Sequence, residues 1–195
     1  MDALVAASVP QAHLSRAALA ADRRAERKRL ARCDAVSARL AELRAIVTVL
    51  TDAREIVRHG WVQHGWFTVA TPVGERLLTT FDVRRVTEQP VTGACLVGSI
   101  VAASGEPATS QLVQRTLDLT WHALREDDDR PPVLCPAPSV RAMRLRDLTR
   151  WNDRDGRSQG EVVGLLHRTG HLAIGHAEAY RAERAALADR PVALS

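Results

Sequence analysis

The feature that most constrains the fold is the long stretch 14–59, which contains neither glycine nor proline. It is rich in alanine, leucine, arginine and glutamate, all of which have high helix propensity. Gly60 tolerates the left-handed conformation that often ends a helix, and Arg58 and His59 suit the negative end of the helix dipole. The sequence therefore predicts one long helix that ends at Gly60.

The second half of this helix carries an apolar seam. Its residues alternate at spacings of three and four, the heptad pattern of a helix that packs along one face. The seam consists of Cys33, Val36, Leu40, Leu43, Val47 and Leu50. These residues either pack on the chain's own core or form a self-association surface, for which the candidates are Leu40, Leu43, Val47 and Leu50.

The first half of the same helix supplies the positive charge of the chain. Residues 13–44 contain nine Lys or Arg and four Asp or Glu, whereas the whole chain has a net charge of only +4. Asp22 and Glu26 offer local pairs, so a solvated helix face is one interpretation. The alternative is a surface that binds a nucleic-acid backbone or an acidic protein. The candidate residues for that surface are Arg23, Arg24, Arg27, Lys28, Arg29 and Arg32.

A change of pattern follows Gly60. Residues 66–71 and 76–83 are rich in aromatic and β-branched side chains, and they flank the turn-forming Pro72 and Gly74. The sequence predicts one short β-hairpin near 66–83. A hairpin alone is marginally stable in water, so we expect it to lie on the helices.

Further helices are predicted from capping residues and apolar periodicity. Ser158 and Glu161 form a capping box, and the helix that they open is expected to end at Gly170. The acidic and proline-rich segment 126–136 is expected to be a loop. The predicted helices after the hairpin begin near Thr92, Ser110, Ser139, Ser158 and His176.

These patterns predict a mainly α fold, in which a long basic helix precedes a compact helical domain with one short β-hairpin. We expect a basic helical arm over 1–44, a core domain over 45–175 and a helical tail over 176–195. No apolar run approaches the roughly 20 residues that cross a bilayer. The sparse cysteines, Cys33, Cys95 and Cys135, fit a reducing compartment. We therefore expect a cytoplasmic protein without a membrane partner.

Four motifs occur in a familiar order. They are Gly60-Trp61, Gly93-Ala-Cys-Leu-Val-Gly-Ser-Ile100, Trp151-Asn-Asp153 and Glu161-Val-Val163. Over residues 45–172 the chain resembles a family of small actinobacterial and phage-associated domains of unknown function. The resemblance implies a single domain and carries no reaction with it.

Cys95 is the one candidate nucleophile. With Thr92 as a helix cap, Cys95 would lie in the first turn, where free amides and the helix dipole favour a thiolate. A cysteine hydrolase or transferase also needs a nearby histidine, and the sequence does not select one among His59, His64, His122 and His171. The favoured alternative is that Cys95 is a small buried residue, since free cysteine is among the most buried types.

The sequence predicts no metal site and no cofactor. His167 and His171 are four residues apart, the spacing of two ligands on one helix face. However, Gly170 is expected to end the helix between them, so that His171 points elsewhere. A calcium loop at 152–156 is rejected because Trp151 and Val162 occupy two of the anchoring carboxylate positions.

The residues Trp151, Asn152 and Asp153 admit two interpretations. They form either an exposed recognition loop or a turn in which Asn152 or Asp153 bonds the local backbone while Trp151 fills the core. The turn is favoured because Asn, Asp and Gly are ordinary turn residues.

The leading hypothesis for function is a non-enzymatic interaction or assembly protein. Its N-terminal helix would mediate self-association or docking to a protein partner. One alternative is a nucleic-acid-binding accessory protein that uses the basic helix. The other is a cysteine-dependent hydrolase or transferase centred on Cys95.

Overall fold

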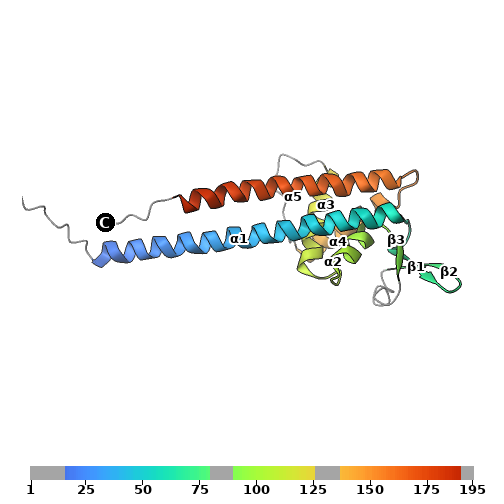
Figure 1. Ribbon diagram of the computed structural model, residues 1–195, viewed down its shortest axis with the longest axis horizontal. Coiled ribbons are helices and arrows are strands. Elements are labelled where there is room, and N and C mark those ends of the chain that lie inside the picture. Colours follow the sequence, from blue (N-terminus) through green and yellow to red (C-terminus); the bar gives the residue numbers. More distant parts are fainter. Residues whose placement is uncertain (1–15, 80–89, 126–136, 190–195) are drawn as a thin grey trace, which may run out of the picture.

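The fold is mainly helical, as predicted. The computed structural model describes residues 16–79, 90–125 and 137–189. Within these ranges the elements are α1 (Arg16–His59), β1 (Phe67–Thr71), β2 (Gly74–Leu78), β3 (Val91–Ala94), α2 (Leu96–Ser104), α3 (Gln111–Arg125), α4 (Pro138–Asn152) and α5 (Gln159–Ala188). Figure 1 shows α1 and α5 as a long pair, with the shorter elements gathered around one end of it.

Parts of some predictions lie outside the described residues. These parts are the chain ends 1–15 and 190–195, the last residues of the predicted hairpin and the loop 126–136, which includes Cys135.

Helix α1 confirms the prediction from the stretch without glycine or proline. It ends at His59, and the Gly60 amide donates to the Ile56 carbonyl at 3.1 Å. The side chain of Gln159, the first residue of α5, donates to the carbonyls of Val57 at 2.6 Å and Arg58 at 3.1 Å. The start of α5 therefore satisfies carbonyls that a helix end leaves without partners.

The pairing of α1 with α5 is antiparallel and stops before the N-terminus of α1. Near the end of α5, Arg32 forms an ion pair with Glu183 at 2.5 Å. Closer still to that end, Arg29 donates to the Leu187 carbonyl at 2.9 Å. Residues 16–28 of α1 extend beyond these contacts by roughly 20 Å, at 1.5 Å per residue. We call this segment the arm (Figure 1).

Helix α5 differs from the prediction because Gly170 does not end it. One helix runs from the Ser158 capping box to Ala188, through both Gly170 and Gly175. A glycine inside a helix costs only about 1 kcal/mol relative to alanine. Burial of α5 side chains on both sides of Gly170 outweighs that cost, Leu166 and Ala173 among them. The proposed domain boundaries at 44 and 175 thus fall within continuous helices.

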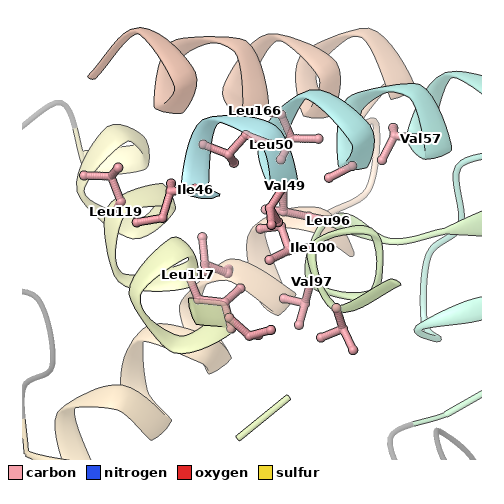
Figure 2. Packing of buried hydrophobic residues seen from close by; sticks show 14 of the residues in the cluster. Ile46, Val49, Leu50, Val57, Leu96, Val97, Ile100, Leu117, Leu119 and Leu166 are labelled. Carbon is pink, nitrogen blue, oxygen red and sulfur yellow. The ribbon is translucent and has the colours of Figure 1, made fainter. Parts of the chain in front are cut away.

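The hydrophobic core lies between α1, α5 and the short helices. Figure 2 shows Ile46 of α1, Ile100 of α2, Leu119 of α3 and Leu166 of α5 converging in it. The heptad seam of α1 belongs to this core, apart from the half-buried Cys33. Three of the four self-association candidates, Leu40, Leu43 and Leu50, are each 2% exposed, and Val47 is half-buried.

The predicted hairpin is present and has a third strand beside it. β1 and β2 pair antiparallel from Phe67 opposite Leu78 to Thr71 opposite Gly74. β3 pairs with the other edge of β1, so the strand order is β2-β1-β3. The sequence missed β3 because Thr92 resembled a helix cap. In the structure Thr92 lies in a strand, and α2 begins only after Cys95.

Two glycines on helices occupy opposite environments. A Cβ atom on Gly98 would lie 2.1 Å from the backbone oxygen of Trp66, so α2 can approach β1 only with glycine at this position. A Cβ atom on Gly170 would have no heavy atom within 4 Å, apart from its own chain neighbours and helix backbone.

These glycines form a matched pair for a stability test. Gly98→Ala should lower the free energy of unfolding by about 2 kcal/mol or more, because the methyl group forces backbone segments apart. Gly170→Ala should raise it by about 0.5–1 kcal/mol, because alanine favours the helix and meets open space. Urea unfolding of both variants measures the difference, and effects of the same sign would contradict this account.

Candidate functional site

Three of the four sequence motifs converge on the side chain of Asn152, at the end of α4. This side chain is fully buried. Its Oδ1 accepts from the indole Nε1 of Trp61 and from the amide of Leu96, each at 3.0 Å. Its Nδ2 donates to the Val62 carbonyl at 3.1 Å and to Asp153 Oδ1 at 2.8 Å. Both lone pairs and both protons are therefore engaged, and we call this arrangement the Asn152 clasp.

The Asn152 clasp joins three parts of the chain. Leu96 is the first residue of α2, so Asn152 satisfies one of the amides at that helix N-terminus. The loop after α1 is held further by Gln63, whose Nε2 donates to the Asn152 carbonyl at 3.0 Å. His64 adopts a left-handed φ of 61° in this loop, and its amide donates to Asp153 Oδ1 at 3.0 Å. The polar groups of the motif thus serve the fold.

Trp151 lies beside this clasp and is partly exposed. The guanidinium of Arg157 stacks 4.0 Å from the centre of its ring, and Arg157 Nε donates to the Trp151 carbonyl at 3.1 Å. Arg157 also pairs with Glu161 of the capping box. These contacts close the turn between α4 and α5. Asn152 and Asp153, however, bond distant segments rather than the local backbone that the turn interpretation expected.

Sequence reasoning missed the partners of Asn152. Trp61 and Asn152 each belonged to a recognised motif, but they lie 91 positions apart. It also missed the buried ion pair between α3 and α4, in which Arg144 Nη1 donates to Asp118 Oδ1 at 2.7 Å. Arg144 stacks in addition over the Trp121 ring, 4.7 Å from its centre. Contacts of this kind depend on which helices pack together, and local sequence patterns do not predict that packing.

Cys95 occupies the N-cap position of α2 rather than its first turn. Its Sγ accepts a hydrogen bond from the Gly98 amide at 3.2 Å, and the residue is only 2% exposed. Burial raises the pKa of this thiol to about 11. Because the thiolate is the nucleophile, we expect Cys95 to be unreactive near neutral pH. Among the described residues, no imidazole forms a hydrogen bond with its sulfur.

Reactivity towards a thiol probe tests this account of Cys95. At pH 8 the probe should label Cys95 only after unfolding, because the thiol is both buried and protonated. Cys33 is half-buried on α1 and should react in the native protein. Peptide mass spectrometry assigns the labelled sites. Native Cys95 that reacts as fast as the unfolded protein's cysteines would contradict the N-cap assignment.

Removal of the Asn152 side chain tests the clasp. Asn152→Ala leaves Trp61 Nε1, the Leu96 amide and the Val62 carbonyl without partners, and each such buried group costs about 1–3 kcal/mol. The free energy of unfolding should therefore fall by about 3 kcal/mol or more. Asp155→Ala, at an exposed position three residues away, should change it by less than about 0.5 kcal/mol. Similar losses in the two variants would contradict a structural role for Asn152.

The six basic candidates divide into two groups. Arg29 and Arg32 are used within the fold: Arg29 pairs with Glu26 at 2.7 Å, and Arg32 pairs with Glu183. The other four are exposed, and no carboxylate of the described residues lies within ion-pair distance of them. These four are Arg23, Arg24, Arg27 and Lys28, and all of them lie on the arm.

Within 16–79, 90–125 and 137–189, no three His, Cys, Asp or Glu side chains cluster as a metal would require. No helix in these ranges is both long enough and apolar enough to traverse a bilayer.

Fold and site together define a small helical domain in which the recognised motif residues hold the structure together. The chain belongs to DUF6197, a family of unknown function, whose sequence profile matches residues 41–172. All four motifs lie within the match, which starts beyond the arm and ends inside α5. No curated protein and no solved structure matches the chain.

Proposed function

We propose that the chain is a non-enzymatic interaction protein whose arm docks on an acidic surface of a partner protein. One observation carries this proposal. α1 continues past the last contact with α5, and there it exposes four basic side chains that have no carboxylate partner among the described residues. A protein surface of opposite charge would complement this face and speed the encounter.

The state of the motif residues supports a non-enzymatic role. Asn152 has no free polar group, and Cys95 is buried and protonated. The residues that suggested chemistry in the sequence are thus engaged in structure.

Charge favours docking over self-association of the arm. Two arms side by side would bring like charges together, because residues 16–28 contain five Lys or Arg and only two Asp or Glu. The apolar seam at Leu40, Leu43 and Leu50 is in the chain's own core, which leaves less apolar surface for a second copy. Self-association stays a prediction, and sedimentation of the full chain tests it.

Nucleic-acid binding is the second candidate, and the same four side chains favour it. Phosphate groups would complement them as well as carboxylates do. Such binding would weaken steeply with salt, because each neutralised phosphate releases counterions. A cytoplasmic location and an actinobacterial or phage-associated origin, both expected from the sequence, are compatible with either candidate.

Charge reversal on the full chain tests both candidates. The arm variant carries Arg23→Glu, Arg24→Glu, Arg27→Glu and Lys28→Glu. The control variant carries the same charge change at four exposed arginines elsewhere, as Arg146→Glu, Arg150→Glu, Arg154→Glu and Arg168→Glu. Cross-linking in extract of the native host, with and without nuclease treatment, measures partner capture, and fluorescence anisotropy measures duplex DNA and RNA binding against salt.

The outcomes separate the candidates. If the docking proposal is right, the wild type and the control variant both capture a protein partner, and the arm variant does not. Two results together would favour nucleic-acid binding over docking. Capture would be sensitive to nuclease, and the arm variant would lose the salt-dependent binding of DNA or RNA that the wild type shows. Equal behaviour of all three proteins would exclude the arm from both functions.

A further inference from the structure

Two imidazoles meet on the exposed side of α5. His167 and His171 lie one turn apart, and their Nε2 atoms are 3.1 Å from each other. Their ring centres are 4.4 Å apart, with the ring planes at 80°. The sequence argued against this pair because no Glu follows His167, because Gly170 was expected to end the helix, and because zinc requires three or four converging ligands. Since α5 continues through Gly170, the two residues share one helical face.

The separation of the two nitrogens fits chelation of one metal ion. If a metal ion lay about 2.0–2.1 Å from each nitrogen, the usual Zn–N distance, the N–metal–N angle would be about 100°. This angle lies between those of octahedral and tetrahedral coordination. Both side chains are exposed, so small rotations can aim the lone pairs at a common point.

The surroundings leave this point open to solvent. The pair borders a hollow of about 160 Å³ between α1 and α5, which is lined by Leu50 and Ile174 among others. Arg54 of α1 also lines the hollow, and its charge is offset in part by Glu55, 3.9 Å away. The guanidinium of Arg168 extends towards Gly164, away from His171.

We propose that His167 and His171 form a two-ligand site for a divalent transition metal ion such as Ni²⁺, Cu²⁺ or Zn²⁺. Imidazole suits these ions, whereas Mg²⁺ and Ca²⁺ require oxygen ligands. Since no third ligand clusters with the pair among the described residues, water completes the coordination. This site is separate from the arm and does not depend on the proposed docking function.

Calorimetric titration of the full chain with Ni²⁺ tests the proposal. The wild type should bind one ion at this site. His167→Ala and His171→Ala should each weaken binding by roughly tenfold or more, because two ligands held together act at high effective concentration. His59→Ala, at an exposed histidine of α1, is the matched control and should leave the affinity unchanged. Circular dichroism verifies that each variant is folded.

A rescue variant tests the spacing itself. Gly175 lies four residues after His171 on the same helix, and a Cβ atom there meets open space. His167→Ala combined with Gly175→His should therefore restore a pair at the same spacing, and with it most of the affinity. Absence of Ni²⁺ binding by the wild type, or equal binding by the wild type and His167→Ala, would overturn the proposal. If the rescue variant does not regain Ni²⁺ affinity, the proposed chelate geometry is wrong.

Discussion

The structure depends on the antiparallel packing of α1 against α5. Each helix buries an apolar face that water would otherwise solvate, and burial of this kind is the main favourable contribution to folding. Polar contacts hold the pair at both ends: Gln159 bonds the last carbonyls of α1, and Arg32 pairs with Glu183. α2 and α3 complete the core on α1 (Figures 1 and 2). α3 joins α4 through the Arg144–Asp118 ion pair.

The polar motif residues of the family match serve this architecture. Asn152 joins the end of α4, the loop after α1 and the start of α2 through four hydrogen bonds. Cys95 caps the same start of α2 with its sulfur. A buried polar group is costly unless it is bonded, so these residues are constrained by their neighbours as strictly as apolar core residues are. Their side chains thus have a structural explanation that requires no catalysis.

Local patterns predicted the elements whose causes are local. The described part of the stretch without glycine or proline is one helix, Arg16–His59, and the Ser158–Glu161 capping box opens α5 as expected. The predictions that were wrong concern places where distant contacts overrule a local preference. Gly170 is a weak helix former, yet α5 continues through it because α1 supports the helix on both sides. Thr92 resembles a cap, yet pairing of β3 with β1 draws it into a strand.

The candidate sites divide in the same way. The sequence by itself determined the long basic helix, its apolar seam and the spacing of His167 and His171, because helix propensity and periodicity are properties of neighbouring residues. Only the tertiary structure decided what those features face. It buried most of the seam in the chain's own core, left the arm beyond the end of α5, enclosed Cys95 and brought the two imidazoles together. Burial and charge pairing are set by segments far apart in the chain, and these meet only when α1 and α5 pack.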